Sequence, residues 1–260
     1  ADTWSIGVDF EPTDELSLST SYYEIEFINI IGIPTPSADI FDDFSSTNFV
    51  SPTGELSYDL VRSFASQVNG GLAQVEPLIA NGAQFYSLID FRVGNYGVLN
   101  IAGLDFSANW VHDTSFGSID LGLNGNYQLD REAQVSPIGV VRDQLGEDAS
   151  LLSARATAGL NIGDFRAQAT LNHSQGYDLT PTNSAPPQLE IDDFNTVDLF
   201  FKYDLPSGFK GFENVSFTLN VDNVFDEDPP ALRRTQPGDR GFGNGHTLGR
   251  MFILGTTVKF

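Results

Sequence analysis

Apolar and polar residues alternate along most of this 260-residue chain. In the stretch 214–223, one side of an extended chain carries Val215, Phe217, Leu219 and Val221, while the other carries Asn, Ser, Thr and Asp. Successive side chains of a β-strand point to opposite faces, so this period predicts strands with one apolar and one polar face. Eight further stretches repeat the pattern, at about 4–10, 16–22, 102–110, 117–129, 152–162, 165–172, 196–205 and 252–260.

The length of these stretches separates two kinds of β-protein. Most run for about ten residues or more, whereas strands of soluble proteins most often have about five or six. Strands that cross a membrane need about nine to eleven residues. In a membrane barrel the apolar side meets lipid, and a polar side rich in Asn, Asp, Arg, Gln and Ser lines the lumen. The pattern therefore favours a membrane barrel over a soluble sandwich.

The connections between the predicted strands alternate in length. Short ones are expected at 11–15, 113–116 and 163–164, a moderate one at 206–213, and long ones at about 29–93, 130–150, 178–193 and 226–249. Outer-membrane barrels have short periplasmic turns and long extracellular loops. The first strand then runs toward the periplasm and the ninth ends there. Bacterial barrels made of one chain have even strand numbers, so we expect this barrel to begin upstream of Ala1.

The longest connection contains a helical pattern. After Ser51-Pro52-Thr53-Gly54, the stretch 55–68 places Leu56, Leu60, Phe64 and Val68 at helical spacing. This spacing predicts one short amphipathic helix within an extracellular loop.

Charge and composition exclude several functions. The chain has 13 basic and 35 acidic residues, a net charge of −22, so it lacks the clustered cations that neutralise nucleic-acid phosphates. It has no Cys, which excludes disulfides, Cys-zinc sites and thiol nucleophiles. The three histidines, His112, His173 and His246, fall at no spacing diagnostic of catalysis. We therefore expect no enzyme, no cofactor and no metal site.

Several aromatic residues fall near the ends of the predicted strands, where the two membrane interfaces carry aromatic girdles. The residues expected in these girdles are Tyr22, Tyr23, Trp110, Tyr127 and Tyr203.

Linked motifs near the end of the chain resemble a known family. The segment 220–230 reads NVDNVFDEDPP, and 249–260 reads GRMFILGTTVKF. Together they resemble the C-terminal end of TonB-dependent outer-membrane receptors, which typically finish with N-x-x-N-[LV]-F-D, a loop, a G-R-x-[FY] strand and a terminal Phe. The stretches 95–105 and 4–23 resemble earlier strands of the same family, in the same order.

The resemblance implies an all-β fold. Residues 1–260 would form an antiparallel transmembrane β-barrel segment, about the last nine strands of a 22-stranded barrel, with a long extracellular loop at about 29–93 and the plug domain absent. The implied function is active uptake, in the outer membrane of a Gram-negative bacterium, of a scarce ligand such as a ferric siderophore, cobalamin or an oligosaccharide.

The resemblance also implies partners. They are outer-membrane lipid, the rest of the barrel with its plug domain, the TonB complex acting through that plug, the barrel-assembly machinery and a small-molecule ligand, but no nucleic acid. The assembly signal would be Phe252, Leu254, Val258 and Phe260 on the final strand. No ligand-contacting residue is implied.

Two other interpretations of the sequence remain open. One is a free-standing small outer-membrane barrel, such as a pore or an adhesin, which the odd strand number opposes. The other is a soluble all-β carbohydrate-binding module, which the strand length opposes. A barrel segment alone exposes two open edges, so we expect no stable monomer in water without its partner strands.

Overall fold

The computed structural model describes most of the chain in two compact units. The described residues are 1–32, 49–50, 55–86, 88–89, 94–95, 97–134, 141–147, 149–179, 188–206, 214–232, 241–242 and 248–259. The larger unit combines 3–25, 101–131 and 144–260, and the smaller combines 1–2, 26–100 and 132–143. None of the described helices combines the length and the apolar character needed to cross a membrane.

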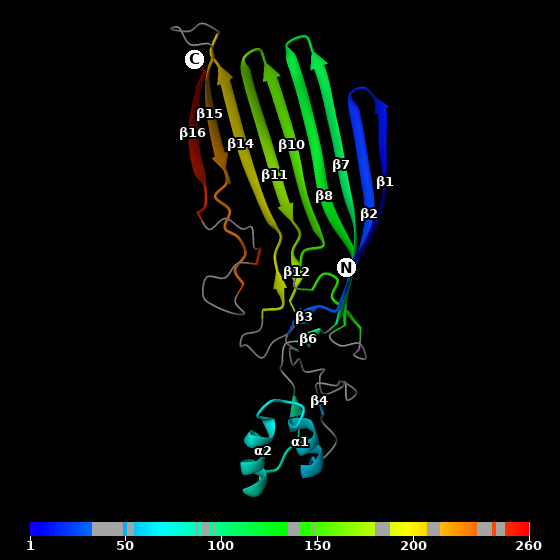
Figure 1. Ribbon diagram of the computed structural model, residues 1–260. Coiled ribbons are helices and arrows are strands. Elements are labelled where there is room, and N and C mark those ends of the chain that lie inside the picture. Colours follow the sequence, from blue (N-terminus) through cyan, green and yellow to red (C-terminus); the bar gives the residue numbers. More distant parts are fainter. Residues whose placement is uncertain are drawn as a thin grey trace. The chain divides into compact units, whose positions relative to one another are not determined.

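Long strands form one antiparallel sheet in sequence order. Its path is β1-β2-β7-β8-β10-β11-β14-β15-β16, and each neighbouring pair is hydrogen-bonded (Figure 1). The bounds are β1 Asp2–Thr13, β2 Leu16–Ile28, β7 Val98–Thr114, β8 Gly117–Gln134, β10 Leu152–Ile162, β11 Phe165–Ser174, β14 Phe194–Asp204, β15 Asn214–Asp222 and β16 Met251–Lys259. All nine expected strands are present among the described residues, and several are longer than expected. The sheet is not closed on itself, because β1 and β16 are its two ends.

The register sorts the side chains onto two faces. On β10, Gly159 lies opposite Asp120 of β8 and Gln168 of β11, whereas Ala158 lies opposite Leu121 and Ala169. We call these the polar face and the apolar face. The apolar face is open over its length, and its exposed large side chains include Leu121, Leu123, Leu171, Phe217 and Leu254. Soluble monomers seldom expose an apolar surface of this kind, so the face requires an apolar environment.

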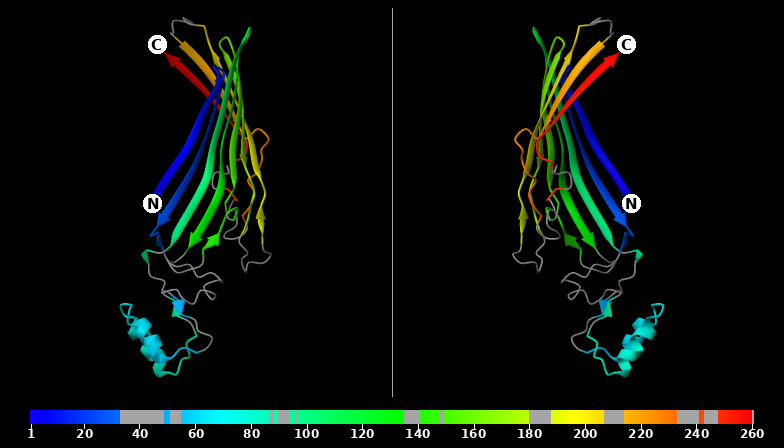
Figure 2. Two further views of the ribbon diagram at one scale, coloured as in Figure 1. Left: turned by 90° about the vertical axis from the view of Figure 1, so that its right-hand side faces the viewer. Right: turned by 90° about the vertical axis from the view of Figure 1, so that its left-hand side faces the viewer.

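Tight turns join the strands at one end of the sheet. Gly163 and Asp164 form a two-residue turn between β10 and β11, and Gly163 takes a positive φ of 53° that favours glycine. At the β7–β8 turn, the Thr114 hydroxyl accepts hydrogen bonds from the backbone N–H groups of Phe116 and Gly117. Figure 1 shows these turns at the top of the sheet, and Figure 2 shows the sheet as a single layer of twisted strands.

The smaller unit contains a helical hairpin and short ladders. Its helices are α1, Tyr58–Ala65, and α2, Gly71–Ala80. The ladders pair β3, Ile31–Gly32, with β6, Gly94–Asn95; β4, Phe49–Val50, with β5, Leu88–Ile89; and the end of β8 with β9, Arg142–Asp143. The sequence predicted one helix here, and α2 was missed. It begins after Gly70 and contains Pro77, and both residue types ordinarily end or interrupt a helix.

The hairpin buries a different side of α1 from the one that the spacing predicted. Leu56 is buried as expected, but Leu60 is 40% exposed, while Val61 is fully buried with Ile79 of α2. The expected helix is present as α1, but its buried side differs from the predicted one because α2 packs on the Val61 side. The side of α1 that is buried depends on where α2 packs, and α2 was not predicted from the sequence.

One ion pair joins the two helices, and it predicts a response to pH. Arg62 donates from Nε to Oε1 of Glu76 at 2.9 Å and from Nη2 to Oε2 at 3.2 Å, and these contacts lower the pKa of the Glu76 carboxyl. A lowered pKa in the folded state stabilises the hairpin above the pKa of unfolded Glu, and this contribution is lost as pH falls through the folded value. The effect is small because both side chains are about half exposed.

In the wild type, hydrogen-exchange protection of residues 58–80 should decrease as the pH is lowered, after exchange rates are corrected for their intrinsic pH dependence. In Glu76→Gln this decrease should be smaller, because the titrating carboxyl is absent. Asp59→Asn is the matched control, because Asp59 lies 3.7 Å from Arg62 and is almost fully exposed. Equal slopes for wild type and Glu76→Gln would contradict this assignment.

Candidate functional site

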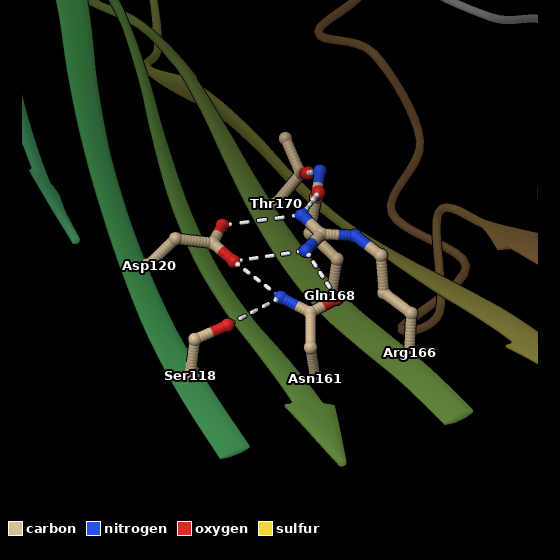
Figure 3. A network of polar contacts seen from close by, with 6 residues as sticks. All are labelled: Ser118, Asp120, Asn161, Arg166, Gln168 and Thr170. Carbon is tan, nitrogen blue, oxygen red and sulfur yellow. Dashed lines mark hydrogen bonds and ion pairs between the residues drawn. The ribbon is translucent and has the colours of Figure 1, made fainter. Parts of the chain in front are cut away.

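The polar face carries a closed network of side chains near its turn end (Figure 3). Arg166 of β11 donates to both carboxylate oxygens of Asp120 on β8, at 2.9 and 3.1 Å. The same guanidinium donates to Asn161 Oδ1 at 3.0 Å and to Gln168 Oε1 at 2.7 Å. Asn161 in turn donates to Ser118 at 3.1 Å. A bidentate Arg–carboxylate pair is strong and fixes the geometry of both side chains. In this part of the polar face, the charges of Asp120 and Arg166 therefore offset each other and their side chains are held in place.

A glycine makes the central ion pair possible. Asp120 and Arg166 lie on strands that are separated by β10, and the β10 residue opposite Asp120 is Gly159. The Asp120 carboxylate lies directly over Gly159, where a Cβ atom would overlap both of its oxygens. Glycine in a strand interior often marks such a close approach. The missing side chain lets Asp120 reach across β10.

Gly159→Ala should therefore break the Asp120–Arg166 pair and lower the free energy of unfolding by about 1–3 kcal/mol. The measurement is urea unfolding of the refolded protein in lipid vesicles. A double-mutant cycle supplies the control: Asp120→Ala should cost clearly less in the Gly159→Ala background than in wild type. Fully additive costs would show that Gly159 does not act through Asp120.

A second polar cluster lies toward the loop end of the same face. Asn172 of β11 donates to Asp198 at 2.8 Å and to Thr196 at 3.1 Å, both on β14. The other oxygen of Asp198 accepts from the backbone N–H of Asn223 at 2.8 Å. These residues line a pocket of about 360 Å³, together with Ser174, Phe194, Asp222 and Gly249.

The C-terminal motif builds the edge of this pocket. Asn223 and Asp226 both have positive φ, 51° and 60°, which Asn and Asp tolerate better than most residues. The Asn223 side chain bonds both the N–H and the C=O of Glu227, each at 2.9 Å. Asp226 accepts from the backbone N–H of Arg250 at 2.7 Å, and Arg250 donates to the Val224 carbonyl at 3.0 Å. The N-x-x-N-V-F-D and G-R segments thus hold each other in place.

A larger pocket lies beside the two-stranded ladder of β12, Tyr177–Asp178, and β13, Glu190–Ile191. Its volume is about 670 Å³, and its lining includes the acidic residues Asp178, Glu190, Asp192 and Asp193. Behind it, Phe242 packs with Ile191 and Phe194 in a small buried cluster. In the described part of the chain, no three or more His, Cys, Asp or Glu residues are grouped to hold a metal ion.

The histidines that the structure describes lie apart. His112 bonds Glu15 at 3.0 Å and stacks on Trp110, with ring centroids 5.4 Å apart. His173 bonds Asn195 on the neighbouring strand at 2.7 Å. His246 lies outside the described residues. The two described histidines thus share neither a partner nor a pocket.

Four of the five expected girdle residues, Tyr22, Trp110, Tyr127 and Tyr203, lie on the apolar face, but Tyr23 does not. Its hydroxyl accepts a hydrogen bond from Asn126 at 2.9 Å on the polar face, above Gly103. The girdle expectation for Tyr23 was wrong, because it directly follows Tyr22 and neighbouring residues of a strand point to opposite faces.

The final strand presents the expected apolar row. Phe252, Leu254 and Val258 lie opposite Val221, Leu219 and Val215 of β15 and are 67%, 82% and 37% exposed. Phe260, the fourth residue of the expected assembly signal, lies outside the described residues.

Comparison with known proteins identifies the family. The model of the family described as "TonB dependent receptor-like, beta-barrel" matches residues 1–224. The chain belongs to the TonB-dependent receptor β-barrel family. No curated protein matches its sequence.

Solved structures of TonB-dependent receptors share the fold. The ferric enterobactin receptor PfeA of Pseudomonas aeruginosa, as a G324V mutant, is 15% identical with a TM-score of 0.57, over 99% of this chain and 31% of that one. The FrpB iron transporter of Neisseria meningitidis is 10% identical with a TM-score of 0.57, over 99% and 30%. The ferric citrate transporter FecA is 13% identical with a TM-score of 0.52, over 98% and 30%. The chain thus spans just under a third of the length of these proteins, and the shared fold confirms the antiparallel barrel segment.

Proposed function

We propose that this chain supplies barrel wall and extracellular loops to an outer-membrane receptor for TonB-dependent uptake of a scarce ligand. The observation that carries the proposal is the two-faced sheet of a TonB-dependent receptor family member, with a hydrogen-bonded polar wall on one side and an open apolar surface on the other. The apolar face suits lipid, and the polar face suits an aqueous lumen. This function is transport, without catalysis by the chain.

The structural neighbours suggest classes of ligand. They include a ferric enterobactin receptor, an iron transporter, a ferric citrate transporter and a copper transporter. For this receptor we propose a scarce nutrient such as a ferric siderophore, cobalamin or an oligosaccharide. The loop of about 29–93, which includes the helical hairpin, belongs to its extracellular side in this proposal. The remaining partners are the plug domain, the other barrel strands and the TonB complex.

A growth assay tests uptake. A strain that lacks the gene is grown on limiting amounts of one ferric siderophore, cobalamin or oligosaccharide at a time. The intact gene should restore growth on one ligand class when tonB is present, and should fail to do so in a tonB-null strain. Growth that does not require TonB would instead indicate a diffusion pore.

The row on β16 is proposed as the signal read by the barrel-assembly machinery, with Phe260 as its last member. Replacing Phe252 and Leu254 by Ser should strongly reduce the folded receptor in the outer membrane, because the apolar row would be interrupted. The measurement is the heat-modifiable band on a gel. Thr257→Ser, on the other face of the same strand, is the control. Unchanged levels of the double variant would refute the signal.

A further inference from the structure

The pocket of about 360 Å³ on the polar face has the size of a small-molecule site, for which about 300–1,000 Å³ is usual. It lies where β11, β14 and β15 reach the loop end of the sheet. Its lining combines one aromatic side chain, Phe194, with hydroxyl, amide and carboxylate groups. A few placed polar groups beside an aromatic wall are typical of sites that fix the orientation of a ligand.

The polar groups of this pocket divide into bonded and open ones. Asn172 and Asp198 bond each other, and Asp198 also holds the backbone of Asn223. By contrast, the side chains of Asp222 and Ser174 have no hydrogen-bond partner within the described residues. The Thr196 hydroxyl accepts from Asn172 and keeps its own O–H group available as a donor. The bonded groups fix the wall, and the open groups face the pocket.

Charge narrows the class of ligand. The lining of this pocket includes two carboxylates, Asp198 and Asp222, and the larger pocket adds four more, while the described residues of both linings include no Lys or Arg. A carboxylate repels an anionic ligand at short range, so these charges disfavour anions and leave neutral and cationic ligands. An ionised Asp accepts hydrogen bonds and a hydroxyl both donates and accepts, which matches a ligand covered with hydroxyl groups.

We propose that this pocket is a subsite for a neutral, hydroxyl-rich ligand, a saccharide. The Asp222 carboxylate accepts from ligand hydroxyls, and Ser174 and Thr196 exchange hydrogen bonds with neighbouring ones. The inference rests on the proposed uptake function and selects the oligosaccharide class within it. It departs from the iron and copper cargo named for the structural neighbours.

The test uses the full-length receptor in detergent. Binding is measured on an array of neutral oligosaccharides, and ferric enterobactin serves as the anionic probe. We expect at least one oligosaccharide series to bind and the ferric probe not to bind. Asp222→Asn should then weaken saccharide binding about tenfold, because hydrogen bonds to a charged acceptor are stronger than those to a neutral amide.

Two further variants distinguish an effect at the pocket from the loss of a negative charge elsewhere and from misfolding. Asp228→Asn removes the same charge from an exposed loop residue outside the pocket lining and should leave binding unchanged. Ser174→Ala should weaken binding several-fold, and it keeps the proposal testable if Asp222→Asn fails to fold, as judged by heat-modifiable mobility.

Three results would overturn the inference. They are no binding of any oligosaccharide by the wild-type receptor, tighter ligand binding by Asp222→Asn, and an equal effect of Asp222→Asn and Asp228→Asn. TonB-dependent growth on another ligand, without saccharide binding, would remove this inference and leave the proposed function intact. Saccharide binding without TonB-dependent uptake would support the saccharide pocket and contradict the proposed uptake function.

Discussion

Leu123→Arg should destabilise the folded receptor by about 2–4 kcal/mol, the cost of an Arg on the lipid face near the bilayer midplane. Leu123 lies on the apolar face of β8, opposite Ala156, and is 41% exposed. It is the seventh residue of β8, counted from Gly117 at the turn. In the proposed membrane barrel, a span of about nine to eleven residues therefore places it near the middle of the bilayer. Leucine at this site suits lipid, and a guanidinium there lacks water.

The matched control is Asn109→Arg on β7. The Asn109 side chain lies on the polar face beside Gly122, the residue before Leu123, so both substitutions fall at the same depth. On a face lined by water, Arg should change stability by less than about 0.5 kcal/mol, as is usual for exposed sites. The measurement is urea unfolding in lipid vesicles. Equal losses for the two variants would contradict the assignment of the faces.

The strands could be predicted because their signal is local. Each long strand carries its own alternation of apolar and polar residues, and all nine were located from it. The ends were predicted too short where the alternation stops: β8 continues through Arg131 and Glu132 to Gln134. Backbone hydrogen bonds can extend a strand beyond the membrane, where no apolar face is needed, and an apolar pattern cannot report this.

The site was far less predictable, because it depends on register. Asp120 and Arg166 are 46 residues apart, and their contact requires three strands in one alignment with a glycine between them. The sequence pattern placed each of these two residues on the polar side of its own predicted strand, but it could not show that they are in contact. Its motif reading found Asn223 and Arg250, but as a family resemblance, without the hydrogen bonds that explain them. The pocket that Asn223 lines was not predicted from the sequence.

The small buried cluster behind the larger pocket joins two loops that are distant in sequence. Phe242 is 7% exposed, and its ring stacks on Phe194 at 5.9 Å and meets Tyr177 edge-on at 5.7 Å. The Tyr177 hydroxyl donates to the carbonyl of Gly241. Among the described residues, Phe242, the hydrogen bond from Tyr177 to Gly241 and a hydrogen bond from the Gln188 side chain to the Ala231 carbonyl at 2.9 Å thus attach the last long connection to the β12–β13 region.

Phe242→Ala should therefore release this attachment, with a local loss of about 3–5 kcal/mol, the usual cost of truncating a buried Phe. Protease sensitivity and hydrogen exchange should rise in 175–179 and 188–193, while the long strands keep their protection, because they are held by their own ladder. Phe225→Ala is the control, since Phe225 is 73% exposed in the same connection. Because Phe194 also lines the smaller pocket, Phe242→Ala should weaken ligand binding as well. Unchanged exchange in both segments would show that the cluster does not hold the loops together.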